Sequence, residues 1–208
     1  MGQKTRKEMM QIPRKSQIRN KISLCYLFDI VGKFYEKKRE LLGYEKLYDY
    51  DRYAPLNTDE SEFSYETAKE IVLKAFNEFS PKFSEIAKKA FDKNWIDAMP
   101  TPNKQSGAFS HSASSDTHPF VLLNFTNKRR DVFTLAHELG HAIHQYLAYG
   151  VGFFNSFTPL TTAETASVFC EMLVFDYMRK NSDGDIKAML AAKIEDIFAT
   201  LYRQINFT

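Results

Sequence analysis

Two histidines four residues apart, His137 and His141, frame a glutamate, Glu138, in the segment "DVFTLAHELGHAIHQYL". Apolar residues recur at helical spacing through this segment, so we expect it to form a helix. Residues four apart lie on one helical face about one turn apart, so both imidazoles can bind one zinc ion. Glu138 lies about 100° further round the axis, where it can serve as a general base rather than a ligand. The pattern therefore predicts a zinc-dependent hydrolytic site.

An ordinary amphipathic helix is the alternative, because the bare pattern arises by chance in about one per cent of chains of this length. Its position on a strongly periodic helix, directly after a strand-like segment, favours the metal site. Gly140 favours it too. A glycine inside a helix costs about 1 kcal/mol relative to alanine, which indicates that another element packs closely there.

A catalytic zinc needs a third protein ligand and an open coordination position. The segment "PLTTAETASVFCEMLVFDYM" offers Glu164, 27 residues after His137, and Glu171, seven residues later on the same helical face. Spacing favours Glu164 over Glu171. The alternative role for Glu164 is to cap its own helix, because Thr161 and Glu164 have the spacing of a capping box.

The other histidines are weaker candidates. His144 lies on nearly the same face as the two histidines of the motif, but a ligand three residues after His141 would strain a tetrahedral site. We therefore expect His144 beside the metal ligands or in the core. His111 and His118 lie in or beside a β element that can approach the site, although their spacing does not indicate it.

Helical periodicity also dominates the rest of the chain. Gly43 is typical of a helix end, Ser64 of a helix cap and Pro81 of a first turn. Besides the motif helix, we expect helices over residues 24–42, 64–79, 81–95, 162–178 and 185–208. Proline, glycine and serine interrupt the period around "SGAFSH" and "FVLLNF", which we expect to form two strands. The predicted fold is mainly α, with a small β element at about residues 106–125 before the zinc-binding helix.

Composition and charge narrow the class of protein. The 208 residues are 44% hydrophobic and 26% charged, without a membrane-length apolar run. Residues 1–21 hold seven basic residues and one acidic residue, so the remainder carries a net charge of −4 and has no nucleic-acid footprint. Two distant cysteines, Cys25 and Cys170, fit buried free thiols and a cytoplasmic location. We expect a disordered basic arm over residues 1–22 and one folded domain over residues 23–208.

Four blocks together resemble a known family. They are "LLGYEKLYDYDRYAPL", "GAFSHS" with "HPFVLLNF", "TLAHELGHAIH" and "PLTTAETASVFCEMLV". In this order they look like the oligoendopeptidase F branch of the thimet-oligopeptidase-like zinc metallopeptidases. The resemblance covers roughly residues 34–207, and its specificity comes from the fixed order of the four blocks.

The resemblance implies a zinc endopeptidase that hydrolyses short peptides, with one zinc ion per chain and no nucleic-acid or membrane partner. It implies that His137, His141 and Glu164 hold the zinc and that Glu138 is the general base for a zinc-activated water. It also implies that Glu171 steadies a ligand histidine. The segment Gly107, Ala108, Phe109 and Ser110 is implied to line the cleft and pair with substrate backbone.

The family's members are longer, so we expect a partial catalytic domain, truncated at both ends relative to them. Their oxyanion-stabilising tyrosine and histidine segment follows the part seen here. Tyr202 is the last tyrosine and is not assigned that role. The alternative hypothesis is therefore a zinc-binding but catalytically incomplete fragment. A helical module that binds nucleic acid through the basic arm is disfavoured, because the body of the chain is acidic.

Overall fold

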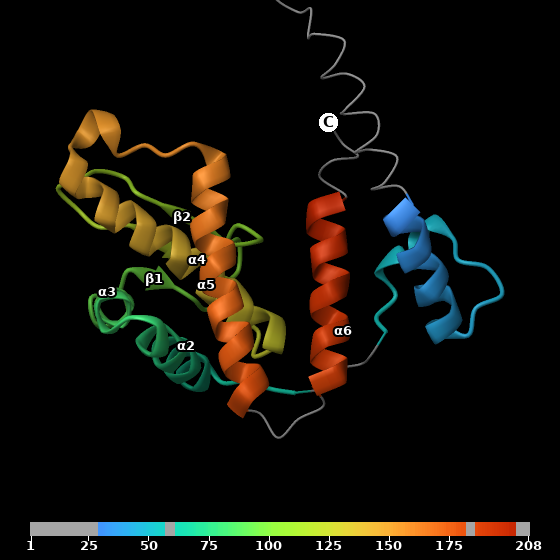
Figure 1. Ribbon diagram of the computed structural model, residues 1–208. Coiled ribbons are helices and arrows are strands. Elements are labelled where there is room, and N and C mark those ends of the chain that lie inside the picture. Colours follow the sequence, from blue (N-terminus) through green and yellow to red (C-terminus); the bar gives the residue numbers. More distant parts are fainter. Residues whose placement is uncertain (1–28, 57–60, 182–185, 203–208) are drawn as a thin grey trace, which may run out of the picture. The chain divides into compact units, whose positions relative to one another are not determined.

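The computed structural model describes residues 29–56, 61–181 and 186–202. These residues fall in two compact units: a large unit within residues 59–184, and a small unit that combines the described parts of residues 1–58 and 185–208 (Figure 1). Each unit is described by itself. The predicted basic arm and Cys25 lie outside the described residues, and the predicted single domain over residues 23–208 stays a prediction.

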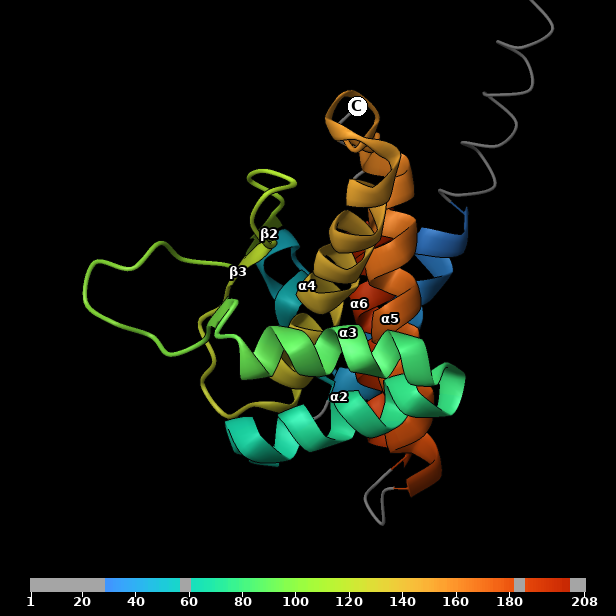
Figure 2. The same ribbon diagram turned by 90° about the vertical axis from the view of Figure 1, so that its left-hand side faces the viewer.

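The large unit contains four helices and a small sheet. Its helices are α2 (Tyr65–Phe79), α3 (Pro81–Asp92), α4 (Arg129–Ala148) and α5 (Leu160–Asn181), and two 3₁₀ turns, η2 (Tyr149–Val151) and η3 (Phe153–Asn155), join α4 to α5. Helix α4 packs along α5, and α2 contacts both of them (Figure 2). The mainly α fold is confirmed.

Two predicted helix starts are confirmed, and one helix end is corrected. The hydroxyl of Ser64 accepts a hydrogen bond from the N–H of Thr67 at 3.1 Å, which caps α2, and Pro81 opens α3. The helix predicted over residues 81–95 is α3, and the prediction that it runs to Trp95 was wrong, because α3 ends at Asp92. Asn94 takes a left-handed backbone conformation with φ of +56°, which a helix cannot contain, and Trp95 then leads into a strand.

The sheet has three strands, β1 (Ile96–Asp97), β2 (Phe109–His111) and β3 (Phe120–Leu122), in the order β1-β3-β2. Strand β3 pairs parallel with β1 and antiparallel with β2. The two strands predicted within residues 106–125 are therefore confirmed, and β1 was missed. Two left-handed residues bound β2: Gly107 has φ of +87° and Ala113 has φ of +50°.

The core of the large unit lies where α4 meets α2, α5 and the sheet. Its fully buried large side chains are Val72, Phe76, Leu123, Val132, Leu135, Leu139, Ile143, Cys170 and Val174. Four of these lie on the apolar face of α4, as the helical periodicity predicts. Each large apolar side chain buried here contributes about 1.5–3 kcal/mol relative to exposure, so the core holds α4 rigidly in place.

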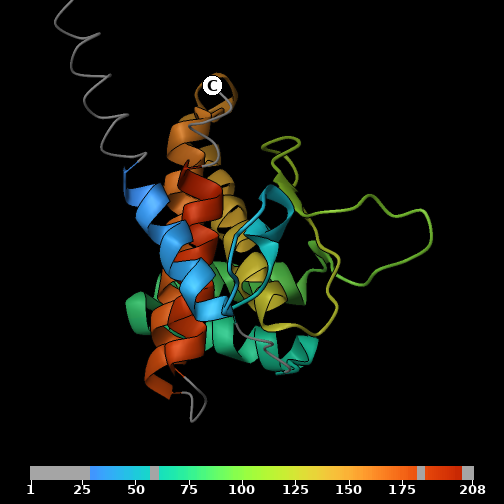
Figure 3. The ribbon, with the colours of Figure 1, turned by 90° about the vertical axis from the view of Figure 1, so that its right-hand side faces the viewer.

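The small unit contains a helix over residues 29–42, the 3₁₀ turn η1 (Asp49–Tyr53), helix α6 (Ile186–Ile197) and a π-helical turn, η4 (Phe198–Tyr202). Gly43 ends the first helix with φ of +69°, as predicted. The ring of Phe34 stacks on that of Phe198 at 4.1 Å, so the first helix lies beside α6 (Figure 3). Across the described part of the chain, no helix is long and apolar enough to cross a membrane.

Candidate metal centre

Helices α4 and α5 approach each other closely at Gly140. A Cβ atom at this position would lie 2.8 Å from the Cα of Ser167 and 2.9 Å from the Sγ of Cys170. These distances are shorter than any normal contact, so only glycine fits. The close packing predicted at Gly140 is confirmed, and it brings the carboxylates of α5 beside the histidines of α4.

His137, His141 and Glu164 form one group of possible metal ligands, with one donor atom from each within 4.8 Å of the others. The Oε2 atom of Glu164 lies 3.4 Å from Nε2 of His137 and 3.8 Å from Nε2 of His141. Two neutral imidazoles and one carboxylate are donors that zinc accepts. The Glu164 side chain is 47% exposed, so the group lies open to solvent on one side.

Glu164 does not serve as the cap of α5. The helix begins at Leu160, so both Thr161 and Glu164 lie inside it. The carboxylate of Glu164 instead accepts a hydrogen bond from the hydroxyl of Ser167 at 3.1 Å while it faces the two histidines. Of the two roles considered from the sequence, the structure supports the one beside the histidines.

Glu171 orients His137. Its Oε2 atom lies 3.3 Å from Nδ1 of His137. An ionised carboxylate only accepts hydrogen bonds, so this contact favours a proton on Nδ1, and in the neutral ring Nε2 is then the nitrogen that can bind a metal. Burial lowers the pKa of His137, but the hydrogen bond to Glu171 and the nearby carboxylates outweigh it and raise the pKa above its usual value. Burial and the charge of His137 lower the pKa of His141.

Glu138 lies next to the donor group and is only 7% exposed. Burial raises the pKa of its carboxyl to about 7, although His137 acts in the opposite direction. Among the described residues, none donates a hydrogen bond to its buried Oε2 atom. A buried carboxylate oxygen without a partner is costly. The site thus has the donor set for a divalent metal and an adjacent carboxylate that is available to accept a proton.

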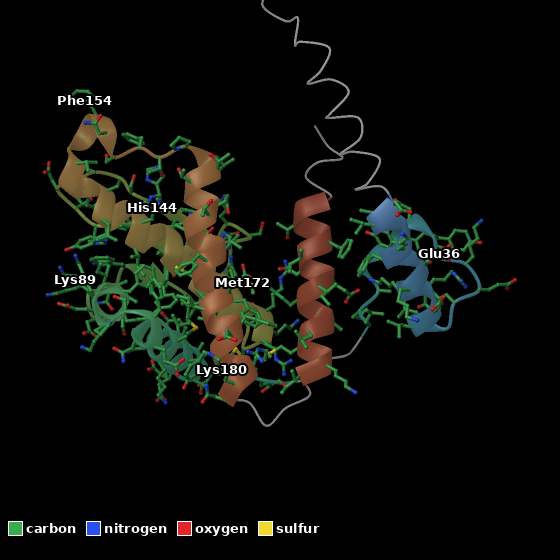
Figure 4. The ribbon with its side chains drawn as sticks, in the orientation of Figure 1. Glu36, Lys89, His144, Phe154, Met172 and Lys180 are labelled. Atoms are coloured by element: carbon green, nitrogen blue, oxygen red, sulfur yellow. The ribbon has the colours of Figure 1, made fainter. Side chains whose placement is uncertain are left out.

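The remaining histidines do not join the donor group. His144 projects from α4 and is half-buried (Figure 4), and its charge lowers the pKa of His141. Nδ1 of His111 accepts a hydrogen bond from the N–H of Ala113, and the ring of His118 stacks on Trp95 at 5.0 Å. His111 and His118 therefore make their contacts within or beside the β element.

The segment predicted to line the cleft is partly a strand. The strand β2 begins at Phe109, so the prediction that Gly107 and Ala108 belong to it was wrong; the left-handed φ of Gly107 starts the strand later. Ser110 lies against α4, where it bonds to Gln145. Sequence reasoning did not single out Gln145. The available signal was its position four residues after His141, on the same helical row.

Solved structures of peptidases share this fold. A crystal structure described as a peptidase from Chlamydophila abortus is 31% identical, with a TM-score of 0.73, and the match covers 95% of this chain and 33% of that one. A structure described as an oligoendopeptidase F from Bacillus anthracis also matches in fold, with a TM-score of 0.73 at 17% identity; the match covers 90% of this chain and 35% of that one.

Sequence relatives lead to the same class. The chain is 33% identical over 184 residues to an oligoendopeptidase F homolog of Borreliella burgdorferi, covering 86% of this chain and 31% of that protein. It is 28% identical over 186 residues to oligopeptidase PepF of Bacillus subtilis, covering 86% of this chain and 27% of that protein. Residues 4–208 match the family model described as peptidase family M3, and the chain belongs to this family. The resemblance to oligoendopeptidase F is thereby confirmed, and the chain spans about a third of the length of its relatives.

Proposed function

We propose that this chain forms the zinc-binding part of an endopeptidase that hydrolyses short peptides. The observation that carries the proposal is the group of His137, His141 and Glu164, whose donor atoms lie within 4.8 Å of one another. Family membership and the names of the relatives, oligoendopeptidase and oligopeptidase, support the substrate class. We propose one zinc ion per chain, held by these three residues.

Zinc held by such a set acts as a Lewis acid toward a carbonyl and lowers the pKa of water. Glu138 is the general base. Its pKa of about 7 suits it to take a proton from water near neutral pH and to return it to the departing amine. In the neutral ring of His137, the contact with Glu171 favours the proton on Nδ1 and so leaves Nε2 free to bind the metal.

The second candidate is a zinc-binding chain without turnover of its own. The chain spans 31% of the length of one curated relative, and the resemblance places the oxyanion-stabilising residues outside the part seen here. Each missing oxyanion donor would remove about 2.7–4 kcal/mol of transition-state stabilisation. Both candidates require the same zinc site and differ only in turnover.

One experiment separates the two candidates. Zinc content is measured by mass spectrometry, and cleavage of quenched fluorescent peptides is compared among the unmodified chain, Glu138→Gln and the exposed-site control Glu70→Gln. We expect one zinc per chain in all three and cleavage only in the unmodified chain and the control. Equal turnover in the unmodified chain and Glu138→Gln would leave the second candidate. An unmodified chain without zinc would overturn both.

We further propose a cytoplasmic location and short peptides, rather than nucleic acid, as partners. The buried, unbridged Cys170 is compatible with a reducing compartment. Fusion of a fluorescent protein to the chain would test the location. Binding to DNA or RNA that weakens as salt concentration rises would contradict the proposed partner class.

A further inference from the structure

We propose that Gln145 and Tyr149 are positioning residues that fix the edge strand β2 in register with the metal-binding histidines. The inference rests on the proposed function, because the register matters only if a peptide lies along β2. Gln145 follows the histidines on α4 and Tyr149 is the C-cap of this helix, and both bond to the segment that contains β2. They touch neither the donor group nor the proposed substrate.

The side-chain amide of Gln145 makes two hydrogen bonds with Ser110, one through its oxygen and one through its nitrogen. The hydroxyl of Ser110 donates to Oε1 of Gln145 at 3.0 Å, and Nε2 of Gln145 donates to the carbonyl of Ser110 at 3.2 Å. Both side chains are half-buried. A two-point contact between one side chain and one residue of a strand fixes the orientation of the strand as well as its distance from the helix.

Tyr149 makes the second contact, with Ser112, which lies two residues after Ser110. Its hydroxyl donates to the carbonyl of Ser112, and its ring packs edge-on against Tyr146 at 6.1 Å. Ser110 and Ser112 are two apart, so their carbonyls point to the same side of an extended strand. The two contacts therefore hold one edge of the same segment.

The spacing of the two elements matches. His137, His141 and Gln145 are each four residues apart and form a single row on α4, and Tyr149, four residues further on at the C-cap of α4, continues this row. Successive members rise by about 6 Å along the helix, whereas two residues of a strand span about 6.8 Å. One row thus carries two possible metal ligands and then two strand contacts, so a slip of β2 would break both contacts.

The direction of the backbone shows which edge is held. The N–H groups of Val121 and Leu123 donate to carbonyls of Trp95 and Asp97, on the β1 side of β3. Phe120 and Leu122 therefore face β2, where they lie opposite His111 and Phe109. The N–H and C=O of Ser110 consequently point away from β3, toward the outer edge of the sheet.

The outer edge is therefore only partly open. The carbonyls of Ser110 and Ser112 are already bonded to Gln145 and Tyr149. Within β2, the N–H of Ser110 is the group left for an incoming peptide. A peptide that pairs there is aligned by the same row that carries His137 and His141, and this alignment places its carbonyl relative to the metal position.

Hydrogen exchange tests whether Gln145 and Tyr149 hold β2, and it requires neither zinc nor turnover. Exchange over residues 106–113 is compared among the unmodified chain, Gln145→Glu, Tyr149→Phe, their double variant and the control Tyr146→Phe, which removes a neighbouring hydroxyl that bonds to Lys89. We expect about tenfold faster exchange in the double variant and the unmodified rate in the control. Unmodified exchange in the double variant would overturn the proposal.

Kinetics test the link to catalysis. A peptide bound in a shifted register meets the metal poorly, so Gln145→Glu should lower kcat about tenfold and change KM by less than about twofold. Ser110→Ala should lower kcat less, because the main-chain contact remains. Zinc content should stay at one per chain in every variant. An unchanged kcat in Gln145→Glu, or a loss of zinc in parallel with kcat, would overturn the positioning role.

The two proposals fail in different ways. An unmodified chain without zinc overturns the proposed function, while the exchange experiment still decides whether Gln145 and Tyr149 hold β2. An unmodified chain that holds zinc and cleaves peptides, but whose Gln145→Glu variant keeps its kcat, leaves the proposed function intact and overturns the inference. A non-cleavable phosphinic peptide should slow exchange at Ser110; its binding without such protection would also overturn the inference.

Discussion

Helices α4 and α6 place their apolar residues in opposite environments. On α4, Val132, Leu135 and Leu139 are fully buried. On α6, an apolar stripe is 39–46% exposed: Ile186, Leu190, Ile194 and Ile197. Helix α6 buries Lys193 instead, and the neighbouring helix buries Lys38. The helix with the candidate metal ligands is fixed by close packing, whereas α6 buries only Met189 among its apolar side chains, and the small unit depends largely on ionic contacts and ring contacts.

Different interactions therefore hold α4 and the small unit in their conformations. Close packing around α4 allows little movement of His137, His141 and Gln145, because shifting them would open voids or create clashes. In the small unit, the ion pair between Lys38 and Glu195 at 2.6 Å joins the two helices. Removing one partner of such a buried pair strongly destabilises the fold, although the intact pair adds little to the free energy of unfolding.

The largest effect is expected at the buried ion pair. Glu195→Gln removes the carboxylate that Lys38, 3% exposed, contacts at 2.6 Å. We expect a loss of about 3 kcal/mol in the small unit, which speeds amide exchange in α6 and residues 29–42 about a hundredfold. The exposed pair Lys88–Asp92, with a similar distance of 2.7 Å, is the control, and Asp92→Asn should leave exchange unchanged. Equal effects of the two variants would contradict the role of burial.

The second prediction compares two helical glycines. Gly140→Ala places a methyl group 2.8 Å from the backbone of α5, so we expect a loss of about 1–3 kcal/mol in the free energy of unfolding and weaker zinc binding. Gly32→Ala meets nothing within 4 Å, so it should stabilise the helix of residues 29–42 by about 1 kcal/mol. Urea denaturation and zinc titration measure both. If both variants changed the free energy of unfolding in the same direction, the different packing of Gly140 and Gly32 would be contradicted.

The smallest effect concerns Cys170, which lies in the interface between α4 and α5. Burial disfavours the thiolate and raises the pKa of this thiol to about 12. At pH 9 about one thousandth of Cys170 is therefore ionised in the folded chain, and iodoacetamide should leave it unmodified until urea is added. The test uses a Cys25→Ser background and mass spectrometry. The unfolded chain ionises this thiol first, so its contribution to stability is lost as the pH rises from about 9 toward 12. Rapid labelling at pH 9 would contradict the packing described for α5.

Periodicity predicted most of the architecture because the packed helices follow local rules. The apolar face of α4, the cap at Ser64 and the turn at Pro81 each depend on neighbouring residues in the sequence. Gly140 also predicted a close neighbour, because a glycine there has no local purpose. The strand β1 was missed because two residues carry no detectable periodicity, and its pairing with β3 is made across about 25 residues of chain.

The candidate site was predictable as far as one helix could specify it. The phase of α4 separated the role of Glu138 from those of His137 and His141. Spacing favoured Glu164 over Glu171 but did not decide between them, because the distance of each carboxylate from the histidines depends on how α5 crosses α4. The contact between Gln145 and Ser110 joins a helix to a strand 35 residues away. The spacing from His141 could have singled out Gln145, but its partner Ser110 depends on tertiary structure.

The two left-handed residues that bound β2 also limit how much peptide the strand can align. Gly107 and Ala113 turn the backbone at either end, and the strand between them covers only Phe109–His111, about 10 Å. Alanine adopts this conformation at a cost of about 1 kcal/mol, so the turn at Ala113 is imposed by the surrounding fold. Under the proposed function, backbone pairing along β2 therefore aligns about three peptide residues. Lengthening a substrate beyond that number should bring no further gain in affinity from this strand.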